Sequence, residues 1–133
     1  MSLEIHERER EGIRILDLSG RLTVGEASAV RDRTRELLAE GAMRFLFNLQ
    51  QVDYIDSTGL GMLVMSYTTV EKAGGELKLL NLNRRNVELL VLTKLFTVFE
   101  LFNEEQDAVN SFFPNREIHR FDILEFVRHQ REE

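Results

Sequence analysis

Asp56-Ser57-Thr58-Gly59-Leu60 marks the point where the hydrophobic pattern of this chain changes its period. Before it, a short apolar run gives way to alternation, which is typical of a β-strand (Phe45 to Leu49, Val52 and Ile55). After it, apolar residues recur at helical spacing (Leu60, Leu63, Val64 and Tyr67). The sequence therefore predicts a buried strand that leads directly into a helix, with Ser57 at the start of that helix.

Ser57 stands where the first backbone N–H groups of a helix lack partners within the helix. This end of a helix carries a partial positive charge, so a solvent-facing hydroxyl here is well placed to carry a phosphate. A new dianion would change what can dock on the helix. The alternative is that Asp56 or Ser57 simply caps the helix, which both residue types do often. The two roles are compatible.

The rest of the chain alternates strand and helix patterns. Strands are predicted at residues 3–8, 13–18, 45–49, 76–82 and 97–101, and helices at residues 26–40, 58–73, 84–93 and 103–112. Ser19-Gly20, Gly74-Gly75 and Pro114 act as stop signals, and Asn103 with Gln106 resembles a capping box. Strands that alternate with helices in this way predict an α/β fold around a parallel or mixed sheet.

Length and composition indicate one globular domain with no need for disulfides. The chain has 133 residues, of which 43% are hydrophobic and 30% charged, and it contains no cysteine. A net charge of −6 disfavours nucleic-acid binding, which needs a clustered positive field. No apolar run approaches the ~20 residues of a membrane span, and no signal-peptide pattern opens the chain. We therefore expect a cytoplasmic protein without direct membrane insertion.

The tail differs from the rest of the chain. Its apolar residues spread around a helical wheel and do not form one stripe (Ile118, Phe121, Ile123, Leu124, Phe126 and Val127). We expect this much apolar surface to be buried against the rest of the protein. We expect residues 1–114 to form the domain and residues 115–133 to form a C-terminal extension packed on or beside it.

The sequence contains no recognisable catalytic or metal-binding motif. Asp-Ser-Thr-Gly is similar to the aspartic protease motif, but its glycine stands three residues after Asp56 instead of two, and no second copy supplies the other carboxylate. His6, His119 and His129 lack metal-ligand spacing, and neither a phosphate-binding loop nor a nucleophile elbow is present. We therefore expect no catalytic residues, no metal, no cofactor and no enzymatic activity.

The predicted central helix has two contrasting faces. At about 100° per residue, one face carries large apolar side chains and should pack on the sheet (Leu60, Leu63, Val64, Tyr67 and Val70). The opposite stripe carries no charge (Thr58, Met62, Met65 and Thr69, with Gly61 at its edge). Such a stripe is either covered by another element, such as the tail, or used by a partner, and methionine is an adaptable contact. If the stripe is open, a phosphate on Ser57 would place charge against the docked partner and expel it.

Three segments together carry a family resemblance. They are Gly20-Arg21-Leu22-Thr23, then Phe47-Asn48-Leu49 followed by Val52-Asp53-Tyr54-Ile55-Asp56-Ser57-Thr58-Gly59-Leu60-Gly61, and Gly74-Gly75-Glu76-Leu77-Lys78-Leu79. These segments resemble the STAS domain, and within it the bacterial anti-sigma factor antagonists. The resemblance runs from about Glu4 to Phe112. It implies a single STAS-like α/β domain, a mixed β-sheet with helices packed mainly on one face.

The resemblance also implies a function. An antagonist of this family binds an anti-sigma factor that is also a serine kinase and thereby frees the sigma factor. The kinase phosphorylates the serine that matches Ser57, which breaks the complex, and a phosphatase reverses the modification. We expect the partner-binding residues to be Thr23, Asp56, Ser57, Thr58, Gly61, Met62 and Met65. This chain departs from the family at Thr23, where many members carry aspartate.

Other functions remain open on the sequence alone. One is a STAS accessory subunit of an ABC-type membrane transport complex, which would never be phosphorylated. Another is an enzyme, which the missing triad and metal geometry disfavour. For the C-terminal extension, three roles are open: adjusting partner choice, supporting a homodimer, or extending the core.

Overall fold

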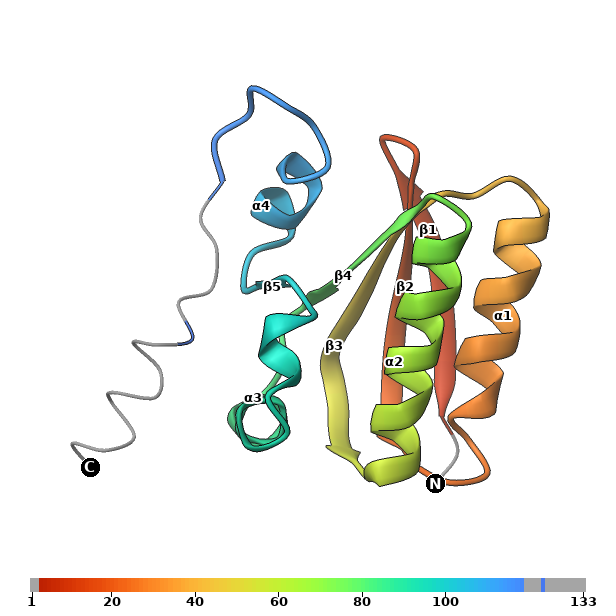
Figure 1. Cartoon of the computed structure of the whole chain (residues 1–133), viewed down its shortest axis with the longest axis vertical. Helices are drawn as coiled ribbons and strands as arrows, with labels where there is room; N and C mark the ends of the chain where they lie inside the picture. Colours follow the sequence, from red (N-terminus) through yellow and green to blue (C-terminus); the bar gives the residue numbers. More distant parts are fainter. Residues whose placement is uncertain (1–2, 119–122, 124–133) are drawn as a thin grey trace.

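A five-stranded sheet organises the computed structural model, which describes residues 3–118 and 123 (Figure 1). The elements in chain order are β1 (Glu4–Arg10), β2 (Ile13–Leu22), α1 (Ser28–Ala39), β3 (Arg44–Ile55), α2 (Ser57–Lys72), β4 (Glu76–Leu80), α3 (Arg84–Leu92), the 3₁₀ helix η1 (Leu95–Thr97), β5 (Leu101–Phe102) and α4 (Glu105–Asn110). The predicted alternation of strands and helices is confirmed for most of these elements.

The sheet is mixed, as the sequence predicted. Its strand order is β1-β2-β3-β4-β5, with β1 antiparallel to β2 and every later pair parallel. The parallel pairs need crossovers, which α1, α2 and α3 supply. Because β2 and β3 are parallel, their carboxyl ends meet at one edge of the sheet. That edge brings the loop after β2 to the start of α2.

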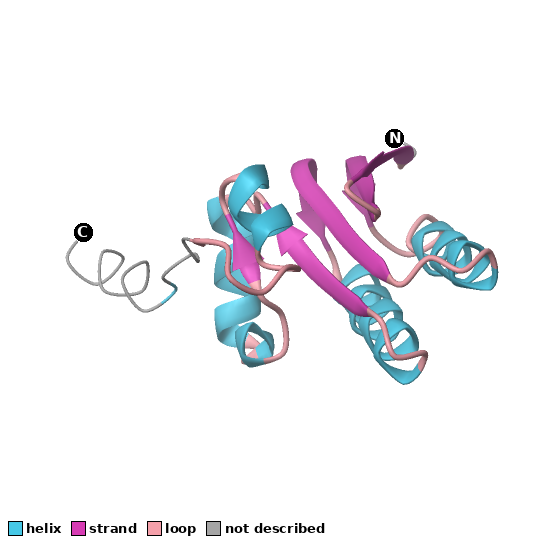
Figure 2. Ribbon diagram, turned by 90° about the horizontal axis from the view of Figure 1, so that it is seen from above, coloured by secondary structure: helices cyan, strands magenta, loops and turns pink. Residues whose placement is uncertain are grey.

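The helices lie mainly on one face of the sheet, which confirms the prediction. Figure 2 shows α1 and α2 together on one side and α4 on the other. The larger core lies under α1 and α2 and includes Leu16, Leu18, Phe45, Phe47, Leu49, Val30, Leu37, Leu63 and Val70. The smaller core lies under α4 and includes Ile13, Ile15, Leu46, Leu80, Phe102, Ala108, Val109 and Phe112.

Strand β2 continues beyond its predicted end. Ser19-Gly20 was expected to stop it, but the strand runs on to Leu22. The pairing with β3 shifts its register on both sides of this dipeptide, and Gly20 has a φ of 114°. Such a bulge keeps the strand paired where a turn was expected, and glycine tolerates the positive φ without strain.

The last strand is present but shorter and later than the predicted residues 97–101. Lys94 takes a left-handed conformation with a φ of 63°, and the chain then winds into η1, where the Val98 N–H donates to the Leu95 carbonyl at 2.9 Å. Only Leu101 and Phe102 are extended, as β5. The apolar residues of this stretch therefore reach the core from a turn: Tyr67 of α2 packs edge-to-face on Phe99, with ring centroids 5.3 Å apart.

The last described helix begins later than predicted. Glu104 is its N-cap and makes no side-chain cap bond, so the capping box of Asn103 and Gln106 is wrong. Most of the C-terminal extension (119–122 and 124–133) lies outside the described residues, while Ile123 is partly buried against the larger core. Among the described residues, no helix is long and apolar enough to cross a membrane.

Candidate functional site

The start of α2 is pressed against the end of β2. A Cβ on Gly59 would lie 1.8 Å from the Leu22 carbonyl oxygen, closer than any two such atoms can approach. Glycine is therefore required here by the contact between two backbones and not by an unusual φ. The Asp56 N–H donates to the same Leu22 carbonyl at 3.2 Å. The junction of β3 and α2 is thus fixed by main-chain contacts to β2.

Asp56 caps α2 and also holds the neighbouring loop. One of its carboxylate oxygens accepts the Gly59 N–H at 2.7 Å, which satisfies a free donor in the first turn of the helix. The other oxygen accepts the Val24 N–H at 3.1 Å from the loop after β2. Of the two capping candidates left by the sequence, the structure therefore assigns the cap to Asp56.

The hydrogen bonds to Asp56 act on its charge state. The Gly59 N–H, followed by the weaker donors Val24 and Thr58, holds the pKa of the Asp56 carboxyl below its usual value, and Arg21 adds a Coulombic contribution. Asp56 is therefore ionised at neutral pH. A fixed negative charge already stands at this corner before any modification of its neighbour.

Ser57 is the first residue of α2, and its side chain is exposed. Within the described residues, no hydrogen bond engages its hydroxyl, because Asp56 supplies the cap. Thr58 beside it is also exposed. A kinase active site could reach the Ser57 hydroxyl without unfolding the helix start, and a phosphate added there would meet the positive end of α2.

The two predicted faces of α2 are present, but the outward one is narrower than expected. Leu60, Leu63 and Val70 are buried against the sheet, and Val64 and Tyr67 pack on the same core. On the opposite stripe Met65 is 40% exposed, whereas Met62 is partly buried and packs against the larger core.

Gly61 differs from Gly59 although only one residue separates them. A Cβ on Gly61 would meet nothing within 4 Å. The fold therefore does not require a glycine there, and glycine within a helix is unfavourable relative to alanine. The space beside it is open to a partner.

The loop after β2 places Thr23 and Val24 beside the start of α2. The Thr23 carbonyl accepts the Glu26 and Ala27 N–H groups at 3.1 and 2.9 Å, and Thr23 is partly buried. Val24 is 71% exposed although it is apolar. Thr23 was predicted from the sequence, whereas Val24 was not, because its position depends on the bond from its N–H group to the Asp56 carboxylate.

A second feature that the sequence does not indicate is a cation–π cluster just before Asp56. The guanidinium groups of Arg21 and Arg85 lie over the Tyr54 ring, 5.1 and 4.5 Å from its centroid. Residues of β2, β3 and α3 meet in this cluster. Because the three positions are far apart in the chain, no sequence spacing indicates them.

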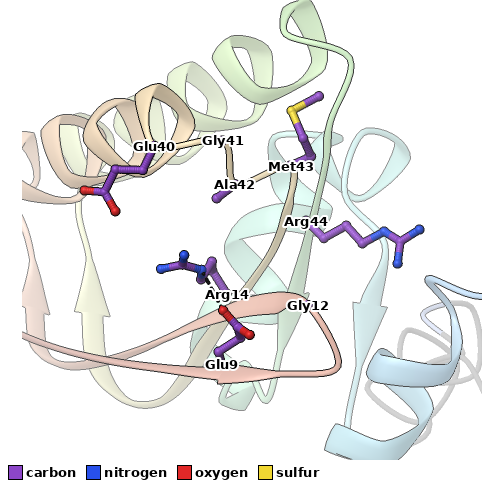
Figure 3. A pocket seen from close by; sticks show the side chains of 8 residues that line it. All are labelled: Glu9, Gly12, Arg14, Glu40, Gly41, Ala42, Met43 and Arg44. Carbon is purple, nitrogen blue, oxygen red and sulfur yellow. Dashed lines mark ion pairs between the residues drawn. The ribbon is translucent and has the colours of Figure 1, made fainter.

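A pocket of about 330 Å³ lies far from Ser57, where the β1–β2 hairpin faces the start of β3 (Figure 3). Its lining carries two basic and two acidic side chains. Arg14 forms an ion pair with Glu9 at 3.2 Å, and Glu40 and Arg44 are the other two. Across residues 3–118 and 123, no group of three acidic or histidine side chains could hold a metal ion. The pocket shares no residue with the Ser57 corner.

Comparisons with known proteins agree with this geometry. Residues 4–108 match the model of the STAS domain. The anti-sigma-B factor antagonist of Bacillus subtilis (strain 168) is 31% identical over 110 residues, which cover 82% of this chain and 99% of that protein. The residues that match the family model include the whole sheet and the Ser57 corner.

Solved structures share the fold. An anti-sigma factor antagonist from Mycobacterium paratuberculosis superposes with a TM-score of 0.74 at 20% identity, covering 83% of this chain and 93% of the other. The Bacillus cell fate determinant SpoIIAA in its phosphorylated form superposes with a TM-score of 0.66 at 17% identity, covering 83% and 100%. At these identities the likeness concerns the fold alone.

Proposed function

The chain belongs to the STAS domain family, and on that premise we propose that it acts as an anti-sigma factor antagonist. In this proposal it binds an anti-sigma factor that is also a serine kinase, and the sigma factor is released. Phosphorylation of Ser57 ends the interaction, and a phosphatase restores it. The protein works in the cytoplasm by binding alone, without a cofactor and without catalysis of its own.

The observation that carries the proposal is the free Ser57 hydroxyl at the head of α2. Asp56 takes over the capping role with a 2.7 Å bond, so Ser57 has no structural duty that phosphorylation would disrupt. The helix N-terminus favours an added anion, so the modified domain should remain folded. The modification would therefore act on binding and leave the fold intact.

The surroundings of Ser57 support a docking surface. Val24 and Met65 expose apolar side chains, and Gly61 leaves open space that the fold does not need. Together with Thr23, Asp56, Thr58 and Met62, these residues form the proposed contact surface.

Electrostatics explain how a phosphate would end the contact. A phosphoserine carries about −1.5 to −2 charges at neutral pH. It would stand beside the ionised Asp56 carboxylate and next to apolar contacts. A partner that covers this surface would have to desolvate both charges, which costs far more than the same contact with a hydroxyl. Binding of the phosphorylated form should therefore be lost.

The first test is to locate the phosphate. The full chain is incubated with ATP and each anti-sigma factor serine kinase of its source genome, and peptides are mapped by mass spectrometry. We expect phosphate on Ser57 of the wild type and none on Ser57→Ala. Ser28 is a matched internal control, because it is also an exposed serine that opens a helix. Phosphate on Ser28 instead of Ser57, or no phosphate with any kinase, would contradict the proposal.

A further inference from the structure

Two methionines of this chain are equally exposed but lie in very different places. The chain has four methionines and no cysteine, so thioethers are its oxidisable sulfur groups. Met43 and Met65 are each 40% exposed. Met43 lines the pocket where the β1–β2 hairpin faces the start of β3 (Figure 3). Met65 stands on the outward face of α2, about two turns after Ser57.

We propose that Met65 is a reversible oxidation site whose sulfoxide weakens docking of the partner on α2. This inference rests on the proposed function, because it concerns the same surface. Peroxide transfers one oxygen to the thioether sulfur, which loses two electrons. The S–O bond forms as the O–O bond breaks, and the leaving hydroxide takes up a proton to give water. A thiol-dependent methionine sulfoxide reductase would return the thioether.

The sulfoxide would change the chemistry of the stripe. A thioether is a flexible apolar contact, whereas a sulfoxide is polar and needs a hydrogen-bond donor when it is buried. The neighbouring Thr69 hydroxyl cannot be that donor, because it already donates to the Met65 carbonyl at 2.8 Å. A docked partner that fits the unmodified stripe would exclude water from the sulfoxide oxygen and offer it no hydrogen bond. Binding should therefore weaken about tenfold.

Met62 provides a comparison on the same helix. It precedes Met65 by one helical turn, but it is partly buried and packs against the larger core. Oxidation rates follow exposure. Met65 should therefore react at a rate close to that of Met43, and Met62 should react more slowly. Peptide mass spectrometry of a peroxide time course measures the three rates in one sample.

The binding test uses the kinase that phosphorylates Ser57, titrated by calorimetry with protein before and after peroxide treatment. We expect oxidised wild type to bind about ten times more weakly, and reductase treatment to restore the affinity. Met65→Leu should show the same affinity before and after a peroxide exposure that is stopped before Met62 reacts, whatever that affinity is. Met43→Leu should remain as sensitive to peroxide as the wild type.

The outcomes separate this inference from the proposed function. Full oxidation of Met65 with unchanged binding, or loss of sensitivity in Met43→Leu instead of Met65→Leu, would overturn the inference and leave the proposed function standing. No binding by untreated wild type to any serine kinase of this class would overturn the proposed function and this inference with it.

Discussion

The start of α2 and the corner under α4 are stabilised in opposite ways. At the start of α2 every contact that fixes the structure includes a main-chain group: Gly59 lies against the Leu22 carbonyl, and the Asp56 carboxylate accepts the Gly59 and Val24 N–H groups. Ser57, Thr58 and Val24 are exposed beside these contacts.

Under α4, side chains are bonded to one another. Arg8 pairs with Asp17 at 2.7 Å and with Glu105 at 2.5 Å, and Arg10 reaches the same Glu105 at 2.8 Å. Nearby, the Lys78 ammonium donates to Ser111 and lies over the Phe112 ring, 4.4 Å from its centroid. This corner uses its polar groups within the molecule.

The difference indicates which region is built for contact with another protein. Where the backbone holds the structure, side chains are free to meet a partner and to be modified. Where side chains hold the structure, little polar capacity remains for binding. Substitutions in each of the two regions test this difference.

The largest effect is expected for Gly59→Ala. A Cβ would lie 1.8 Å from the Leu22 oxygen, so β2 and α2 would have to separate. We expect the free energy of unfolding to fall by about 3 kcal/mol or more. Urea denaturation followed by circular dichroism measures it. A loss below about 1 kcal/mol would show that the junction yields easily and is not fixed by this contact.

Glu105→Gln removes the central carboxylate of the α4 corner. The hydrogen bond from Arg8, ahead of that from Arg10, lowers the pKa of Glu105 to about 2. Because its pKa is lowered in the folded protein, the ionised carboxylate stabilises the fold fully above about pH 4.5, and this contribution is lost as the pH falls towards 2. Because water partly screens the site, we expect a loss of about 1–2 kcal/mol at neutral pH.

The pH dependence provides the check on Glu105→Gln. The wild type should lose more stability than the variant between pH 5 and pH 2, in urea denaturation series at fixed ionic strength. Glu104→Gln is the control, because its side chain makes no cap bond. Parallel pH curves for wild type and Glu105→Gln would refute the assigned role of the carboxylate.

Gly61→Ala should act in the opposite sense to Gly59→Ala. The added Cβ meets nothing within 4 Å, and alanine is the better helix former. We expect the free energy of unfolding to rise by about 0.5–1 kcal/mol. Binding of the serine kinase should weaken, since the methyl group occupies the space left for the partner. A variant that is more stable and binds normally would place Gly61 outside the contact surface.

The most local effect is expected for Asp56→Ala. Both the Gly59 and Val24 amides lose their acceptor, so their hydrogen exchange should become faster. Amides under α4 should exchange as in the wild type. In the wild type, lowering the pH through the depressed pKa of Asp56 should weaken the protection of the same two amides against exchange, because protonation of the carboxylate weakens both hydrogen bonds. Unchanged exchange at Val24 would show that the loop does not depend on this carboxylate.

Much of the fold was predictable from local patterns. The change of period around Asp56 located the β3–α2 junction, and the spacing of Leu60, Leu63 and Val70 identified the buried face of α2. These features depend on neighbours in the chain, which sequence periodicity reports directly.

The errors arose where distant residues or single backbone angles decide the structure. A bulge at Gly20 keeps β2 paired with β3, and a left-handed Lys94 turns the expected strand into η1. Within the site, the bond from Val24 to Asp56 joins positions 32 residues apart. Periodicity carries no information about such contacts, so the loop beside Ser57 was only partly anticipated.

Negative charge at Ser57 should prevent docking while the fold persists. Calorimetric titration of the serine kinase with Ser57→Asp, Ser28→Asp and wild type measures this effect, with circular dichroism to confirm that all three are folded. We expect Ser57→Asp to bind at least about ten times more weakly than the wild type, and Ser28→Asp to bind like the wild type. Equal binding by folded Ser57→Asp and wild type would contradict it.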